Sequence, residues 1–144
     1  MKKIALLTAF TLLLTGCTAT VNIDAAPDAN NPACAEVIVR LPDAIDGQEK
    51  RITGSQSTGA WGNPTSVLLR CGLTPSAVST LPCITASDID WLVDDSKAPS
   101  FRFITYGRTP ALEVIVDSEK ASGTTALDEL SAAVQFLPSD KTCS

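Results

Sequence analysis

The chain has 144 residues, a formal net charge of −5 and no histidine, and 44% of its residues are hydrophobic. This length suits one small globular domain with a core of its own. An acidic chain without a basic stripe is a poor binder of nucleic acid, because neutralising phosphates provides that affinity. The absence of histidine excludes Ser-His-Asp and Cys-His nucleophile systems.

Residues 1–16 have the layout of a bacterial lipoprotein signal peptide. Two lysines precede an apolar run, residues 4–14, and this whole segment contains no acidic residue. The run is about half of the ~20 residues that span a bilayer. The motif Leu14-Thr15-Gly16-Cys17 fits a lipobox, in which cleavage precedes Cys17 and acyl chains are attached to it. The alternative is a simple secreted protein in which Cys17 is incidental.

A lipid on Cys17 predicts a location on the extracytoplasmic face of the cell membrane. One acyl chain anchors only marginally, and a diacylglyceryl cysteine supplies more than one. Removing residues 1–16 leaves nine basic residues against sixteen acidic ones, a net charge of −7. The acyl chains are therefore expected to hold the mature protein at the membrane, without help from anionic head groups.

The mature chain is expected to have two parts. Residues 17–31 are the lipidated N-terminus and a flexible tether, because the segment is small and polar and has no apolar periodicity. Residues 32–144 form a single globular domain. A domain of this size gains from covalent cross-links.

The remaining cysteines indicate those cross-links. Without Cys17 the cysteine count is even, which argues for two disulfides in an exported chain. Three pairings are open from spacing alone. No Cys-x-x-Cys occurs and histidine is absent, so a metal site is not expected. The four candidates are Cys34, Cys71, Cys83 and Cys143.

The first predicted element is a helix over residues 31–41. Asn31-Pro32 is a typical start, with an N-cap residue followed by proline in the first turn. Apolar residues recur at helical spacing until Pro42, and the residue before a proline disfavours the α region. Residues 46–66 are rich in turn-forming types and are expected to be mostly loop, with room for a short strand near 51–53.

The rest of the domain alternates strands and turns before a second helix. Residues 74–87 are predicted to be loop, and the bridge 107–110 makes the last two strands a hairpin. Thr125 with Asp128 resembles a capping box, and an apolar stripe follows until Pro138. The predicted strands are residues 67–71, 89–93, 101–106 and 112–116.

These elements predict an α+β fold with two layers. The sheet is expected to be antiparallel with three to five strands, and both helices are expected on one face.

Sequence motifs for catalysis or cofactors are weak in this chain. The acidic residues at 88, 90, 94 and 95 invite a calcium loop, but Leu92 takes a ligand position and Val93 takes the place of the turn glycine. No lysine follows a serine at Ser-x-x-Lys spacing. We therefore expect no cofactor, no metal and no enzyme activity.

Four side chains are candidates for contact with a partner. Trp61 lies in a tight-turn composition, where it is either a buried plug under the loop or an exposed anchor, and the plug is favoured. Arginines can pair with a ligand carboxylate, although pairing with surface Asp and Glu is favoured for them. The candidates are Trp61, Arg70, Trp91 and Arg108.

A series of short blocks resembles a known family. The most specific are Ala60-Trp61-Gly62-Asn63-Pro64 and Leu69-Arg70-Cys71-Gly72, followed by Ile89-Asp90-Trp91-Leu92. They resemble an uncharacterised family of actinobacterial envelope proteins, domain of unknown function 3515. The resemblance implies an extracytoplasmic place and no known activity. It also implies that Cys34 pairs with Cys71, which leaves Cys83 to pair with Cys143.

The leading functional hypothesis is a non-catalytic envelope lipoprotein that binds a protein partner or a cell-wall component. One alternative is a carboxylate- or metal-dependent enzyme that acts on cell-wall material. Another is a small-molecule carrier, which would need an enclosed apolar cavity.

Overall fold

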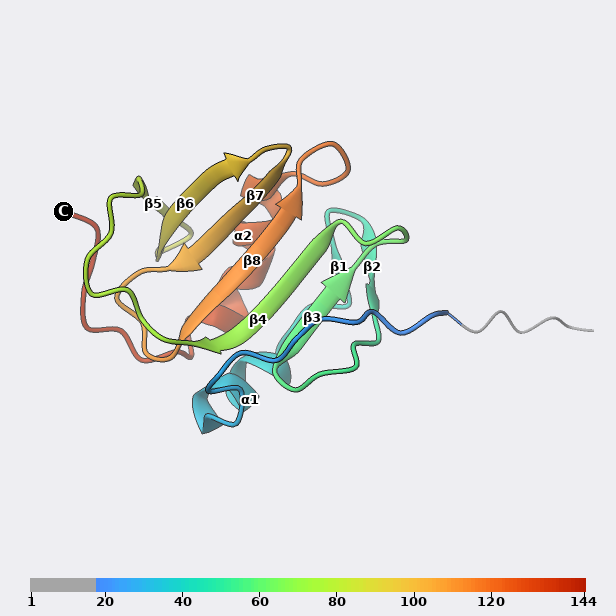
Figure 1. The fold of residues 1–144 in the computed structure, drawn as a ribbon, viewed down its shortest axis with the longest axis horizontal. Helices are drawn as coiled ribbons and strands as arrows, with labels where there is room; N and C mark the ends of the chain where they lie inside the picture. Colours follow the sequence, from blue (N-terminus) through green and yellow to red (C-terminus); the bar gives the residue numbers. More distant parts are fainter. Residues whose placement is uncertain (1–17) are drawn as a thin grey trace, which may run out of the picture.

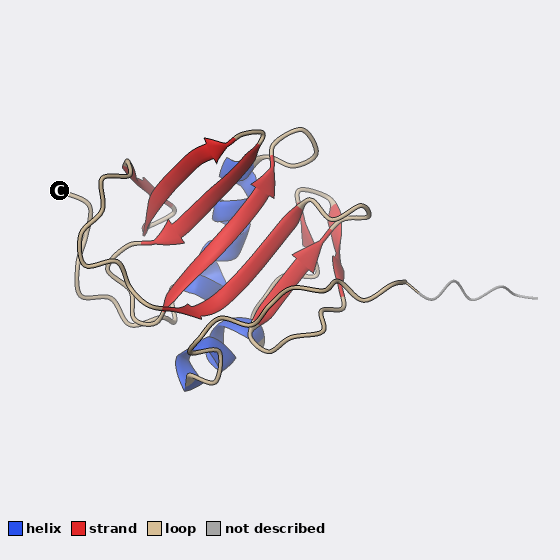
Figure 2. Cartoon of the chain, viewed as in Figure 1, coloured by secondary structure: helices blue, strands red, loops and turns tan. Residues whose placement is uncertain are grey.

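The computed structural model describes residues 18–144, so Cys17 and the signal segment lie outside it. The described chain forms one eight-stranded antiparallel sheet with two helices (Figure 1, Figure 2). The helices are α1 (Pro32–Ile38) and α2 (Gly123–Val134). The strands are β1 (Ala44–Ile45), β2 (Gln48–Arg51), β3 (Thr58–Trp61), β4 (Val67–Leu73), β5 (Cys83–Ala86), β6 (Ile89–Lys97), β7 (Ser100–Thr105) and β8 (Ala111–Asp117).

The sheet consists of two meanders that meet at its centre. The strand order is β1-β2-β3-β4-β8-β7-β6-β5. The chain leaves β4, crosses to the far edge at β5, and returns strand by strand to β8. There β8 pairs with β4, with Val67 opposite Val116 and Leu69 opposite Val114. The long connection, residues 74–82, therefore spans half of the sheet.

The expectation of three to five strands is wrong, because the sheet has eight. Residues 46–66 were predicted to be mostly loop because of their polar composition, but they contain β2 and β3. Residues 74–87 were predicted to be loop because of their prolines, but they contain β5. Strand β3 has small residues for a packing reason. A Cβ atom on Gly59 would lie 2.7 Å from the ring of Trp61, so the strand needs glycine there. Tertiary packing rather than local propensity makes β3 a strand.

The hydrophobic core lies on one face of the sheet, which α2 covers from behind in Figure 1. Alternation along β8 directs Leu112, Val114 and Val116 into this core and Glu113 to the opposite face. One stripe of α2 packs against them. Its buried residues are Ala126, Leu127, Leu130, Ala133 and Val134. Helix α1 contributes Cys34 and Val37 to the same core.

Both helices begin at a side-chain cap. The Asn31 carboxamide oxygen accepts the N–H of Ala33 at 3.0 Å, as the Asn31-Pro32 start predicts. In α2 the cap is Ser122, whose hydroxyl accepts the N–H of Thr125 at 3.3 Å. The predicted cap at Thr125 is therefore wrong by about one turn. Thr125 lies inside the helix instead.

Residues 18–31 are not a free tether in this structure. Val21 forms a parallel bridge with Thr53, and the Asp28 N–H donates to the Gly72 carbonyl at 2.9 Å. A Cβ atom on Gly72, where φ is +108°, would lie 2.4 Å from the backbone of Asp28. Ala26 and Ala29 are buried. The short side chains of this segment are typical of a linker, but here they allow the segment to lie closely against the sheet.

Two disulfides tie peripheral segments to the sheet. Cys34 of α1 is bonded to Cys71 of β4, and both are fully buried. Cys83 of β5 is bonded to Cys143 near the C-terminus. This is the pairing that the family resemblance implies.

Candidate functional site

The two tryptophans lie inside the core. Trp61 and Trp91 are each 0% exposed. The Trp61 indole N–H donates to the Pro42 carbonyl at 3.0 Å, which fixes the ring beneath the loop that follows α1. The indole nitrogen of Trp91 has no hydrogen-bond partner among residues 18–144. Trp61 is thus the plug that the sequence favours, and neither ring presents a surface to a partner.

Arg70 belongs to an ionic cluster on the open face of the sheet. The Glu113 carboxylate is 1% exposed and lies between two guanidinium groups. Arg70 of β4 donates to one oxygen at 2.5 Å, and Arg102 of β7 donates to the other. Strand pairing places these three residues side by side across β4, β8 and β7. Both arginines are therefore engaged within the protein, as surface pairing with acidic residues predicts.

Arg108 closes the end of α2. Its guanidinium is largely buried and donates to the Leu137 carbonyl at 2.5 Å. Burial lowers the pKa of the Arg108 guanidinium, and the Asp90 carboxylate opposes that shift. Free carbonyls at a helix C-terminus attract cations. Arg108 therefore satisfies backbone groups that follow the helix and is not free to take a ligand.

The aspartates around β6 also have internal partners. Asp90 accepts the Thr85 hydroxyl at 2.6 Å and the Cys143 N–H at 2.9 Å. Hydrogen bonds from Ser96 hold the pKa of the Asp94 carboxyl below its usual range. Within residues 18–144, no group of three or more Cys, Asp or Glu side chains is placed to hold a metal ion.

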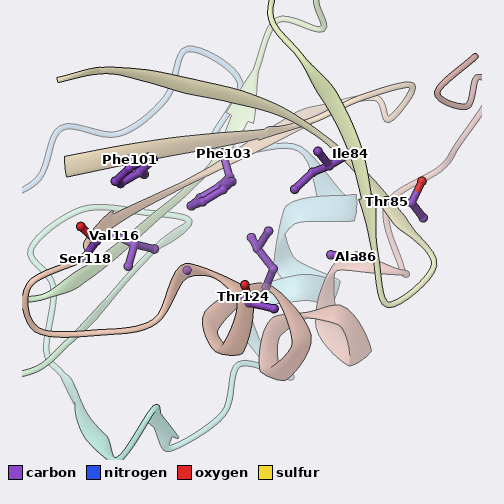
Figure 3. A pocket seen from close by; sticks show the side chains of 10 residues that line it. Ile84, Thr85, Ala86, Phe101, Phe103, Val116, Ser118 and Thr124 are labelled. Carbon is purple, nitrogen blue, oxygen red and sulfur yellow. The ribbon is translucent and has the colours of Figure 1, made fainter. Parts of the chain in front are cut away.

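An apolar pocket lies between the sheet and the first turn of α2. It has a volume of about 360 Å³ and opens to solvent on one side (Figure 3). Figure 3 shows Phe103 of β7 and Ile84 of β5 projecting into this hollow above the helix. The lining residues are Ile84, Thr85, Ala86, Phe101, Phe103, Val116, Ser118, Gly123, Thr124 and Leu127.

The pocket follows from how the edge of the sheet curls. Strand β5 contacts α2, so the far edge of the sheet folds over toward the helix. Phe101 and Phe103 are two residues apart on β7 and so lie on the same face. Phe103 is almost buried, whereas Phe101 is half-buried at the opening. Every lining residue is uncharged, so the pocket can take up an apolar group but offers no acid–base pair.

Sequence reasoning missed this pocket. The spacing of Phe101 and Phe103 indicates one apolar face of a strand. This face is expected of any half-buried strand and so does not indicate a pocket. The other wall is β5, which was predicted to be loop, and it approaches α2 only through the tertiary fold. Nothing local in the sequence indicates that Ile84 and Leu127 lie across one hollow.

The comparison with known families now identifies the chain. A family model described as protein of unknown function, DUF3515, matches residues 5–142. The chain belongs to the DUF3515 family. The resemblance of the sequence blocks to domain of unknown function 3515 is therefore confirmed. No curated protein and no solved structure matches the chain.

The DUF3515 match covers the pocket and the docked N-terminal segment. It includes both cysteines of the Cys34–Cys71 disulfide, and it ends one residue before Cys143. The Cys83–Cys143 disulfide therefore joins one residue inside the match to one outside it. Of the helices in residues 18–144, neither is long and apolar enough to cross a membrane.

Proposed function

We propose that this DUF3515 protein is a non-catalytic binding module, held on the extracytoplasmic face of the cell membrane by a lipid on Cys17. Its apolar pocket receives an apolar group that an envelope partner presents. The pocket between β5, β7 and α2 is the observation that carries this function.

The sequence supports the membrane anchor. The lipobox places Cys17 directly after a short apolar run. Disulfides persist in oxidising compartments outside the cytoplasm, and the chain has two. The resemblance of its sequence blocks to actinobacterial envelope proteins also supports a location in the cell envelope.

The chemistry of the pocket supports binding. Ligand pockets are concave, mostly apolar, and contain a few polar groups that orient the ligand. Here Phe101, Phe103 and Leu127 supply the apolar surface, and Ser118 and Thr124 supply hydroxyl groups. The buried carboxylate of Glu113, which lies outside the pocket, is paired with Arg70 and Arg102.

A small-molecule carrier is the second candidate. The volume of about 360 Å³ lies in the range of small-molecule sites, which are typically ~300–1,000 Å³. The pocket is open on one side, however, and a group that remains attached to a larger partner can enter it.

Binding of an apolar dye tests the pocket. We expect the mature protein to bind anilinonaphthalene sulfonate, and Thr124→Phe to weaken that binding about tenfold, or ~1.4 kcal/mol, by filling the opening. Thr74→Phe, on an exposed loop, is the matched control and should bind like the parent protein. Fluorescence titration measures both affinities. Equal binding by the parent protein and Thr124→Phe would place the dye elsewhere and contradict the proposed site.

Cross-linking in intact cells separates the two candidates. A photoreactive amino acid at position 124 should capture one envelope protein that the same group at position 74 does not capture. Mass spectrometry identifies the captured species. A small molecule captured at position 124, without any protein, would favour the carrier.

A further inference from the structure

The start of the described chain is fastened to the β2–β3 region of the sheet. The Val21 N–H donates to the Ile52 carbonyl at 2.9 Å, and the Gly54 N–H donates to the Val21 carbonyl at 3.2 Å. Closer to the N-terminus, the Arg51 guanidinium donates to the Ala19 carbonyl at 2.7 Å. Three hydrogen bonds thus fix residues 19–21 on the domain.

These contacts leave very little chain between Cys17 and the domain. Ala19 is two residues after Cys17, and two residues of extended chain reach at most ~7 Å. A lipid on Cys17 therefore brings the bilayer surface close to the Arg51 side chain. A free tether of residues 17–31 would instead let the domain turn in any direction.

The surface next to Ala19 has the chemistry of an interfacial contact. We define the β2 surface as Thr18, Lys50 and Ile52. Ile52 is 71% exposed, and Lys50 is exposed beside it. Lys50 is cationic in a mature chain whose net charge is −7, whereas the half-buried Arg51 guanidinium donates to the Ala19 and Gly62 carbonyls and holds the N-terminal segment in place. Interfacial segments combine an apolar side chain with basic residues that meet phosphate groups.

We propose that the β2 surface rests on the phospholipid bilayer and that the domain has one fixed orientation there. This proposal rests on the proposed function, because it requires the lipid on Cys17. The β2 surface contacts the lipid head-group layer, because the chain between Cys17 and Ala19 is too short to hold this surface far from the bilayer.

This orientation places the apolar pocket at a distance from the membrane. The pocket is lined by residues of β5 and β7. These strands lie at one side of the sheet, whereas β2 lies near the other edge (Figure 1). Four strand-to-strand steps separate β2 from β7, which at ~4.8 Å each is about 19 Å along the sheet. The pocket opening is then accessible to a partner in the envelope.

Paramagnetic broadening by lipid head groups tests the orientation. The lipidated mature protein is placed in nanodiscs of phosphatidylcholine and phosphatidylglycerol that include a gadolinium-chelating lipid, and amide signals are recorded by NMR. Lys50 and Ile52 should lose signal, while Thr85 and Thr124 at the pocket should retain it. Uniform loss at the four positions, or greater loss at the pocket, would overturn the proposal.

Two variants test the role of the fastened segment. Val21→Pro combined with Arg51→Ala removes two of the three hydrogen bonds that hold residues 19–21 on the domain. The loss of signal should then become even across the domain. Arg40→Ala, on the exposed surface after α1, is the matched control and should keep the parent pattern. If the double variant does not fold, the pattern of the parent protein still decides the proposal.

The same sample distinguishes failure of the anchor from failure of the orientation. If mass spectrometry shows no acyl group on Cys17, the proposed membrane anchor itself is wrong. If the acyl group is present and the signal loss is uniform, only the fixed orientation is wrong.

Discussion

Glu113 shows how one residue organises the open face of the sheet. Its carboxylate is almost fully buried, yet it lies on the face opposite the hydrophobic core. Arg70 and Arg102 cover it from the two neighbouring strands, and both remain partly exposed. The carboxylate thus pairs with both guanidinium groups and offsets one of their two positive charges. Removing it would leave two positive charges side by side.

We expect Glu113→Ala to lower the free energy of unfolding by about 2–3 kcal/mol. A fully buried pair typically costs ~3–5 kcal/mol when one partner is removed. The expected loss is smaller because the side chains of Arg70 and Arg102 are 30% and 37% exposed. Urea denaturation of the disulfide-intact domain measures the change.

The matched control for this substitution is Glu36→Ala. Glu36 pairs with Arg40 one helical turn away, and its side chain is 58% exposed. Exposed pairs of this kind contribute about 0.3–0.5 kcal/mol. Similar losses for the two variants would show that the Glu113 cluster contributes no more than an ordinary surface pair.

Residue roles were predictable from sequence only where composition limits them. The four disulfide cysteines follow from an even cysteine count once Cys17 is set aside, in a chain expected to be exported. The burial of Trp61 follows from its tight-turn setting. The partners of Arg70 do not follow, because Glu113 is far away in sequence and only the pairing of β4 with β8 brings them together.

At the scale of elements, the two disulfides hold different parts of the fold. Cys34–Cys71 fastens α1 to a central strand inside the core. Cys83–Cys143 fastens the C-terminal segment to the edge strand β5, and Cys83 is exposed. Loop-closure entropy alone gives similar values, about 3.8 kcal/mol for the 37-residue separation and about 4.3 kcal/mol for the 60-residue one. The two disulfides therefore differ in how deeply they are buried rather than in loop-closure entropy.

We expect mild native reduction to open Cys83–Cys143 before Cys34–Cys71. A thiolate must reach the sulfur atom it attacks, and the buried pair is shielded from it. Alkylation of the partly reduced protein followed by peptide mapping identifies the opened bond. Labelling of Cys34 and Cys71 first, or of all four cysteines together, would contradict this order.

Sequence patterns found the elements that carry strong periodicity. The hairpin of β7 and β8 and the apolar stripe of α2 were predictable because their side chains alternate or repeat. Strands β3 and β5 were not. In β3 the packing of Trp61 requires glycine at position 59, and β5 is a short edge strand whose half-exposed Ile84 lines the same pocket as Leu127 of α2.

At the scale of the whole molecule, the N-terminal segment from Thr18 and the apolar pocket lie toward opposite edges of one sheet. The N-terminal segment binds beside β2, and the pocket forms where β5 curls over α2. A rigid sheet between them would carry a binding site at a set height above the bilayer. Residues 17–144 carry a net charge of −7, so the domain as a whole has little affinity of its own for anionic lipid.

Intact-mass spectrometry of the protein extracted from the membrane fraction tests the lipid anchor most directly, and both proposals depend on that anchor. We expect a chain that begins at Cys17 and carries the added mass of a diacylglyceryl group, with or without a further acyl chain. A Cys17→Ser protein should lack that mass. An unacylated chain that begins at another residue, or one that retains residues 1–16, would contradict the anchor.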